Sequence, residues 1–210
     1  MILHNYWRSG TSYRTRIALN LKGVEYRQAG IDLRAGAHRS DAFRALNPQG
    51  LVPALEVDGR VLTQSPALLE WIEERWPQPL LLPRDPADRA EVRAMAAIVA
   101  CDIHPLNNMR ALQALKTDFG ADDAATKRWA ARWITAGFEA IERLIERRGG
   151  GWAWGDTPSL ADCCLIPQVY SARRFETDLS AFPRILAVGA RAAEHPAFQA
   201  AHPDRQPDAD

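Results

Sequence analysis

A proline-rich segment divides this sequence into two halves with different patterns. Residues 77–88, PQPLLLPRDPAD, contain four prolines, and proline cannot continue a helix because it lacks the backbone N–H and clashes with the preceding turn. Strand-like and helical runs alternate before this segment, whereas only helical periodicity follows it. We therefore expect two domains: residues 1–82, which are mixed α/β, and residues 83–210, which are all helical.

The α/β half begins with the pattern strand, helix, strand. Residues 2–7 are an apolar run typical of a short strand, and residues 12–22 have the spacing of a helix that ends at Gly23. A second strand-like run covers residues 24–33, and a short helical stretch covers residues 37–46. This half is therefore expected to open with a βαβ unit.

A hairpin and a further helix complete the first half. Two strand-like runs, residues 54–57 and 60–63, flank Asp58-Gly59, a dipeptide favoured in two-residue hairpin turns. Ser65-Pro66 then predicts a helix with serine at the N-cap and proline in the first turn. The whole first domain is expected to run βαβ and then ββα.

The second half predicts several amphipathic helices. Apolar residues recur at helical spacing over residues 90–103 and again over residues 129–145. Ser159 and Asp162 resemble the capping box that opens a helix, which gives both residues a structural role. The stretch HPDRQPDAD at residues 202–210 looks frayed.

The composition argues against several classes of function. The chain has 26 acidic and 26 basic side chains, so no overall charge attracts it to nucleic acid or to a membrane surface. It lacks a signal-peptide pattern and any apolar run of about 18 residues, so we expect a cytoplasmic protein. The cysteines, Cys101, Cys163 and Cys164, lack metal-ligand spacing, and buried free thiols are the favoured interpretation. No metal is expected.

A short polar turn, here called the cradle (residues 9–11), lies between the first strand and the first helix. Ser9, Gly10 and Thr11 stand where a helix N-terminus offers unpaired amides and partial positive charge, and Arg8 precedes them. The hydroxyls and amides can bind an anion, either a phosphate or a thiolate. No glycine-rich nucleotide motif is present. The alternative is that Ser9 and Thr11 only cap the helix.

Two later segments favour recognition of a peptide-like ligand. Val52-Pro53 precedes a strand, and a cis peptide bond there would leave the Val52 amide and carbonyl available for strand-like pairing. Gln64 and Ser65, at the start of the next helix, offer an amide, a hydroxyl and the helix dipole to a carboxylate. Each segment alone also fits an ordinary structural role. Together with the cradle they indicate a peptide-binding surface.

These segments resemble the glutathione transferase superfamily and, within it, the zeta class. RSGTSYRTRIALNLKG is similar to the zeta active-site stretch, and NPQGLVPALEVDG and LTQSPALLEWIEE are similar to its glutathione-binding segments. CDIHPLNNMRAL lies in the helical half, as in that class. SGTS departs from the more usual Ser-Ser-Cys pattern and is more similar to bacterial glutathione-dependent maleylpyruvate isomerases. The resemblance covers nearly the whole chain.

The resemblance implies a thioredoxin-like domain followed by an all-helical domain, a homodimer, and glutathione as cofactor. It also implies a set of glutathione contacts. These are Ser9 and Thr11 at the sulfur, Val52 at the cysteinyl backbone, Gln64 and Ser65 at the γ-glutamyl carboxylate, His38 and Gln49 near the glycyl end, and Asp102 at the γ-glutamyl amine bound by the neighbouring subunit. Because the cradle contains no cysteine, it cannot form a mixed disulfide, and the nucleophile must come from the cofactor.

The resemblance further implies that three arginines bind the carboxylates of the substrate. Arg8 precedes the cradle and Arg110 lies in the helical half. The third is one of the pair Arg173 and Arg174, of which Arg174 is the favoured candidate. Bidentate arginine suits a carboxylate and stabilises the enolate formed when a thiolate adds to the substrate. Arg14 and Arg16 are more simply interpreted as helix surface or as members of structural pairs.

The helix that carries Arg110 is expected to present a row of polar residues on one face. The row consists of His104, Asn107 or Asn108, and Ala111, with Arg110 one turn past Asn107. His104 and Asn108 are further candidates for cofactor contact. Pro105 should kink the helix or mark its boundary. His104 equally fits the role of a partly buried structural histidine.

These inferences predict a glutathione-dependent cis–trans isomerase of maleylpyruvate or maleylacetoacetate in the catabolism of aromatic compounds. A thiolate that adds to the double bond makes it a single bond that rotates, and elimination returns the thiolate. Hydroxyl donors and a helix dipole would lower the thiol pKa from its usual value of about 8.5. Two alternatives remain: a general glutathione transferase that conjugates electrophiles, and a glutathione-binding module without catalytic activity.

Overall fold

The computed structural model describes residues 1–209. It contains two compact units: one comprises Met1–Leu81 together with the segment that begins at Ala193, and the other comprises Leu82–Ala192. The first unit is therefore discontinuous in sequence, whereas the sequence led us to expect two continuous domains that meet after residue 82. Among the described residues, no helix is both long enough and apolar enough to cross a membrane.

The first unit is built on a four-stranded mixed sheet. Strands β1 (Ile2–Asn5) and β2 (Arg27–Gly30) are parallel, and the antiparallel strands β3 (Ala54–Val57) and β4 (Arg60–Thr63) extend the sheet in the order β2-β1-β3-β4. The β3-β4 turn consists of Asp58 and Gly59, as expected, and both residues have positive φ, as a tight hairpin requires.

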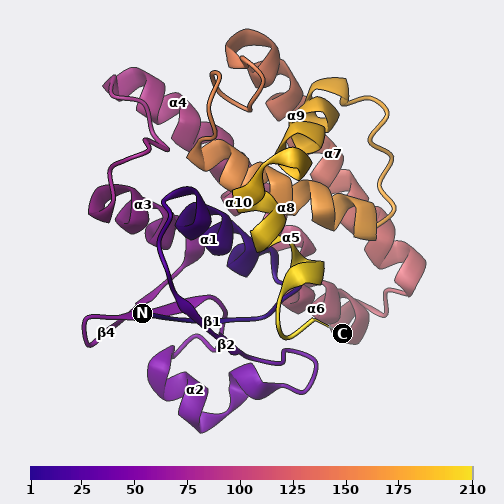
Figure 1. Cartoon of the computed structure of the whole chain (residues 1–210). Helices are drawn as coiled ribbons and strands as arrows, with labels where there is room; N and C mark the ends of the chain where they lie inside the picture. Colours follow the sequence, from indigo (N-terminus) through magenta and orange to yellow (C-terminus); the bar gives the residue numbers. More distant parts are fainter. Residues whose placement is uncertain (210) are drawn as a thin grey trace. The chain divides into compact units, whose positions relative to one another are not determined.

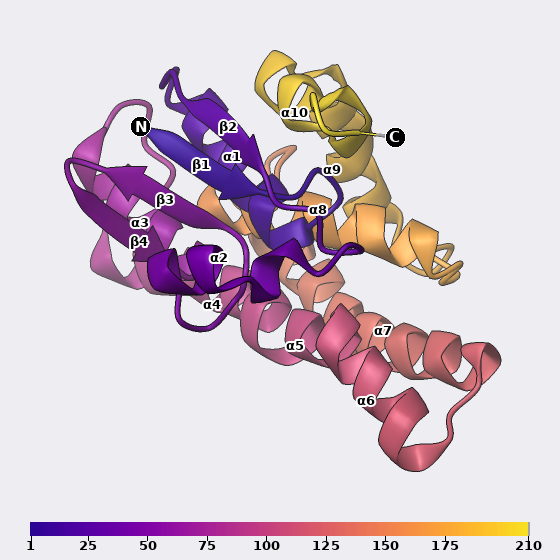
Figure 2. The same cartoon turned by 90° about the horizontal axis from the view of Figure 1, so that it is seen from below.

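Helices cover both faces of this sheet. α1 (Gly10–Leu21) and α3 (Ser65–Arg75) lie on one face, and α2 (Asp41–Leu46) lies on the other (Figures 1 and 2). α10 (Pro196–Ala201) packs against α1, and short 3₁₀ helices form at Ala37–Arg39 and Pro203–Arg205. The predicted order βαβ-ββα is confirmed, and with it the thioredoxin-like arrangement. Fully buried apolar side chains of β1, β3, α1 and α3 form the core: Leu3, Ile17, Leu19, Leu55, Leu68 and Ile72.

Both arginines of α1 beyond the cradle are buried, so the helix-surface role suggested for them is wrong. Arg16 donates hydrogen bonds to Asn5 Oδ1 and to the carbonyl oxygens of Trp7 and Ala201, at 2.7, 2.8 and 3.0 Å. These bonds connect α1 to β1 and to α10. Arg14 is buried to the same degree. The alternative suggested by the sequence, a role in structural pairs, is the correct one.

The second unit is all helical, as expected. α4 (Pro86–Ala97) continues through a π-helix (Ile98–Ile103) into α5 (His104–Asn107), and the helices α6 (Met109–Phe119), α7 (Asp123–Arg148), α8 (Leu160–Arg174) and α9 (Pro183–Glu194) follow. α8 is buried over most of its length because it packs against α4 and α7.

Asp162 opens α8 in the structural role that the sequence predicted. Its carboxylate accepts hydrogen bonds from the backbone N–H groups of Ala153 and Ser159 and from the Ser159 hydroxyl, each at 2.8 Å. Burial raises the pKa of Asp162 to about 6, although these three hydrogen bonds favour the charged form and lower it. The carboxyl group thus fastens the start of α8 to the preceding turn.

Two local expectations, the N-cap residue of α3 and the burial of Cys101, are corrected. Gln64 rather than Ser65 occupies the N-cap of α3; its φ is 68° and its side chain makes no capping bond, while Ser65 is already helical. Cys101, in the π-helix, is exposed, which corrects the expectation of a buried thiol there, whereas Cys163 and Cys164 are buried in α8, as expected.

The expectation that residues 202–210 are frayed is wrong for the described part of that stretch. The side-chain amide of Gln206 donates to the carbonyl oxygens of Ala200 and His202 at 2.9 and 2.7 Å, and its Oε1 accepts from Gln28 Nε2 at 3.0 Å. Gln206 is consequently buried. Long-range side-chain contacts of this kind leave no local signal in the sequence.

Candidate functional site

The cradle is both a helix cap and a cluster of hydroxyl groups. Ser9 is the N-cap of α1, where its backbone is extended and its Oγ accepts from the Ser12 N–H at 3.3 Å. The Ser9 Oγ and Thr11 Oγ1 atoms lie 2.9 Å apart. Capping therefore accounts for one of the lone pairs on Ser9 and leaves its hydroxyl proton for another partner.

Thr11 connects the cradle to the loop before β3. Its hydroxyl donates to the carbonyl oxygen of Val52 at 3.0 Å, and the Val52-Pro53 peptide bond is cis, which is one of the arrangements considered from the sequence. The Val52 carbonyl is thus already bonded, which corrects the expectation that both backbone groups are available. Within the described chain, the Val52 N–H has no hydrogen-bond partner.

The positions of the hydroxyl protons follow from these contacts. Each hydroxyl has one proton, and the proton of Thr11 is used in the bond to Val52. Ser9 must then be the donor in its contact with Thr11. Of the two hydroxyl groups, that of Ser9 can turn its proton toward an anion at the α1 N-terminus without breaking the Thr11–Val52 hydrogen bond.

Gln64 and Ser65 lie together at the start of α3 but in different surroundings. Gln64 is exposed, and its Nε2 lies 2.5 Å from Oε1 of Gln49, so these two predicted residues come together. Ser65 is buried, and its Oγ accepts from the guanidinium of Arg14 at 3.4 Å. A buried cation at this helix N-terminus adds to the positive potential that the helix dipole supplies.

His38 occupies the 3₁₀ helix before α2. Burial lowers the pKa of His38, and the positive charges of Arg39 and Arg44 lower it further, so the imidazole is neutral at pH 7. A Cβ atom at Gly50, whose φ is 61°, would lie 2.8 Å from the His38 carbonyl oxygen. Gly50 therefore lets the loop that carries Gln49 approach His38 closely, a contact that sequence reasoning missed.

Arg8 is ordered by an aromatic neighbour. Its guanidinium carbon lies 5.2 Å from the ring centroid of Trp7, within the range of a cation–π contact, and the Trp7 side chain is buried. Neither this stacking nor the Arg14 contact with Ser65 was expected. The adjacency of tryptophan and arginine in the sequence is the one signal that could have indicated the first of them.

The remaining candidates belong to the second unit. Asp102 is exposed in the π-helix, and His104 is the first residue of α5. Asn108 has an extended backbone and caps α6 by accepting from the N–H groups of Arg110 and Ala111 at 2.9 and 3.2 Å. This break in the helix corrects the expectation that His104, Asn108 and Arg110 form one row, because His104 and Arg110 are on separate helices.

Arg174 is the last residue of α8, where its guanidinium carbon lies 6.0 Å from the Tyr170 ring centroid. Arg110 is in the first turn of α6. The structure thus brings together two groups of predicted residues in the first unit: the Ser9, Thr11 and Val52 group, and the Gln49 and Gln64 pair. The predicted convergence of three arginines stays a prediction.

Comparison with known proteins identifies the family. A family model described as the N-terminal domain of glutathione S-transferase matches residues 8–75, and one described as the C-terminal domain matches residues 108–200. The maleylpyruvate isomerase of Ralstonia sp is 56% identical, over 99% of this chain and 99% of that protein.

Solved structures agree with this result. The holo structure of maleyl pyruvate isomerase, a bacterial glutathione S-transferase in the zeta class, has a TM-score of 0.98 and 55% identity, covering 100% of both chains. The maleylacetoacetate isomerase of Anaeromyxobacter dehalogenans 2CP-1, with GSH bound in its active site, has a TM-score of 0.90 and 43% identity, covering 100% of this chain and 97% of that one. The chain therefore belongs to the glutathione S-transferase family, in the zeta class of maleylpyruvate and maleylacetoacetate isomerases.

Proposed function

We propose that this protein is a glutathione-dependent cis–trans isomerase of maleylpyruvate or maleylacetoacetate. The observation that carries the proposal is the hydrogen-bonded chain from Ser9 through Thr11 to Val52 at the N-terminus of α1. It provides hydroxyl and amide donors for an anion, and it contains no cysteine that could act as the nucleophile. The names of the relatives at high identity support the same reaction.

The residues of the first unit fit glutathione. The Val52 N–H has no partner in the described chain and suits the carbonyl of the cysteinyl residue, in the manner of an added strand. Gln64 and Ser65 suit the γ-glutamyl carboxylate, since the α3 N-terminus and the buried Arg14 cation are both at this place. His38 and Gln49 suit the glycyl end. We assign Asp102, His104 and Asn108 to further cofactor contacts, with Asp102 reaching the ligand of a second subunit in a cytoplasmic homodimer.

When bound, glutathione supplies a thiolate that adds reversibly to the double bond and so permits rotation about it. The Ser9 hydroxyl would donate a hydrogen bond to the negatively charged sulfur, and the α1 N-terminus would favour the same charge. Thr11 holds the loop before β3 through its hydrogen bond to the Val52 carbonyl, and this bond stays intact when Ser9 turns its hydroxyl from Thr11 toward the sulfur. Arg8, Arg110 and Arg174 bind the carboxylates of the substrate and stabilise the enolate charge that develops during addition.

The reaction is tested by following the enol absorbance of maleylpyruvate and of maleylacetoacetate with purified protein. We expect isomerisation that requires glutathione and returns it unconsumed. Removing one donor from such an anion site typically costs about 10²-fold in kcat, and we expect this loss for Ser9→Ala. Thr117→Ala is the matched control, because Thr117 is exposed on α6.

Three results would decide against the proposal. Equal conversion with and without glutathione would exclude a catalytic thiolate. Net consumption of glutathione with apolar electrophiles, unaffected by Arg8→Ala or Arg110→Ala, would indicate a conjugating transferase instead. Binding of glutathione without turnover of any of these compounds would indicate a binding module.

A further inference from the structure

The segment 196–209 reaches the backbone immediately before the cradle. Oδ2 of Asp208 accepts a hydrogen bond from the Trp7 N–H at 3.0 Å, across 201 positions of sequence. Asp208 also fits closely against β2, because a Cβ atom at Gly30 would lie 3.3 Å from both Cβ and Oδ2 of Asp208. The other carboxylate oxygen, Oδ1, is buried and has no hydrogen-bond partner in the described chain. Asp208 as a whole is half-buried, and its carboxylate lies against the backbone at Trp7 and Gly30 and not free in solvent.

Both backbone polar groups of Trp7 are bound to residues distant in sequence or on another element. The N–H binds Asp208, and the carbonyl oxygen accepts from Arg16 at 2.8 Å. Arg16 also donates to the Ala201 carbonyl at 3.0 Å. The segment 196–209 therefore contacts the Trp7 N–H directly, through Asp208, and the Trp7 carbonyl indirectly, through Arg16. The position of Trp7 is therefore set jointly by α1 and by this segment.

Trp7 in turn supports Arg8. The Arg8 guanidinium stacks on the buried Trp7 ring at 5.2 Å. The cradle has anchors of its own, because the Ser9 N–H donates to the Tyr6 carbonyl at 3.0 Å and Ser9 Oγ accepts from Ser12. A displacement of Trp7 would consequently affect the Arg8 side chain more than the hydroxyl of Ser9.

We propose that Asp208 is a positioning residue, which holds Trp7 through its N–H and thereby orients Arg8 for the carboxylate of the substrate. The proposal rests on the role given to Arg8 in the proposed function. It assigns to the segment 196–209 a part in substrate binding that is separate from glutathione binding. Asp208 itself touches neither the substrate nor the thiolate.

The test compares Asp208→Ala with Asp208→Asn in full-length protein. Asparagine keeps an oxygen that can accept the Trp7 N–H, whereas alanine removes it and leaves that N–H unpaired. We expect Asp208→Ala to raise KM for maleylpyruvate about tenfold, with kcat and the KM for glutathione within about twofold. Asp208→Asn should stay within about twofold of the wild type in all three. Asp204→Ala, exposed in the same segment, is the matched control and should change nothing.

A double-mutant cycle with Arg8→Ala separates this role from a general loss of structure. If Asp208 acts through Arg8, adding Asp208→Ala to Arg8→Ala should change KM by less than about twofold, because the interaction is already absent. Additive effects of the two substitutions, or an unchanged KM in Asp208→Ala, would overturn the proposal. A parallel fall of kcat, glutathione affinity and Tm in Asp208→Ala would also overturn the proposal, because it would indicate a general loss of structure. A wild-type protein without glutathione-dependent isomerisation would instead refute the proposed function.

Discussion

Lys22 and Glu73 form an ion pair inside the first unit. Lys22 Nζ donates to Glu73 Oε2 and to the Pro79 carbonyl, both at 2.5 Å, and Glu73 Oε2 also accepts from the Leu81 N–H at 3.0 Å. The two side chains are 0% and 4% exposed. Burying two charges costs desolvation free energy, which is offset here by the close contact of the two groups and by their hydrogen bonds to the backbone. The pair joins the end of α1 to α3 and to the proline-rich segment.

Removing one member of this pair should be far more damaging than removing both. We expect Lys22→Met to lower the free energy of unfolding by about 3–5 kcal/mol, because the Glu73 charge stays buried without its partner. The double variant Lys22→Met/Glu73→Leu should recover most of this loss. Urea denaturation measures both, with Lys127→Met as control: its pair with Glu176 is exposed and should contribute less than about 1 kcal/mol. A double variant less stable than Lys22→Met would refute this explanation.

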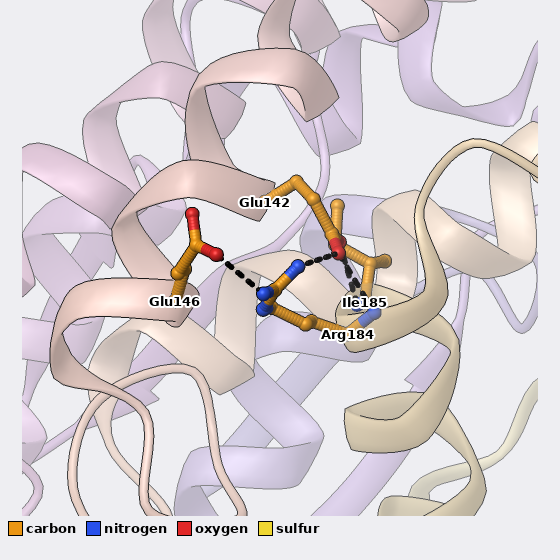
Figure 3. Close-up of polar contacts among 4 residues, drawn as sticks. All are labelled: Glu142, Glu146, Arg184 and Ile185. Carbon is orange, nitrogen blue, oxygen red and sulfur yellow. Dashed lines mark hydrogen bonds and ion pairs between the residues drawn. The ribbon is translucent and has the colours of Figure 1, made fainter.

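At the level of whole elements, α9 begins without a capping side chain of its own. Phe182 and Pro183 stand at its start, and the first N–H groups of the helix are satisfied from another helix. Glu142 of α7 accepts from the backbone N–H groups of Arg184 and Ile185 at 2.9 and 3.0 Å, as Figure 3 shows. The Arg184 side chain adds contacts with Glu142 and with Glu146.

We expect Glu142→Ala to destabilise the protein by about 1–3 kcal/mol, since it leaves two N–H groups at the α9 N-terminus without acceptors. Glu146→Ala removes only an exposed side-chain pair with Arg184 and should cost less than about 1 kcal/mol. Thermal unfolding of the two variants provides the comparison. Equal losses would mean that the side chain of Arg184, and not the backbone of α9, carries the interaction.

On the scale of the whole molecule, the chain completes its first unit only after passing through the second. α10 packs on α1, and Phe198 and Ala201 of α10 are buried there. Arg16, Gln28 and Trp7 donate hydrogen bonds to residues of the segment 196–209. The α/β unit therefore depends on residues more than a hundred positions beyond its last strand.

This dependence predicts a large effect of a substitution in α10. Phe198→Ala should lower the free energy of unfolding by about 3–5 kcal/mol, as expected when a buried aromatic side chain leaves a cavity. Phe119→Ala is the control, because Phe119 is 79% exposed and its loss should stay within about 0.5 kcal/mol. Chemical denaturation of both variants tests the expectation. A small effect of Phe198→Ala would show that α10 is not part of the core.

The parts of the fold that the sequence predicted well depend on neighbouring residues. The Asp58-Gly59 hairpin and the Asp162 helix start both follow from local steric and hydrogen-bonding preferences. Gln64 at the N-cap of α3 is an exception, since the most favoured cap residue is its neighbour Ser65. Local preference was overridden there by the backbone path from β4 into α3.

By itself, the sequence determined the order of elements, the helical second half and the cradle, whereas the glutathione-binding residues implied by the family resemblance stay a prediction. The tertiary structure alone decided that Arg14 and Arg16 are buried, that Thr11 bonds the Val52 carbonyl, and that Asp208 binds Trp7. The physical reason is the range of the interactions. Caps and turns are formed by residues a few positions apart, whereas a buried charge or an unpaired N–H finds its partner only when distant segments pack together.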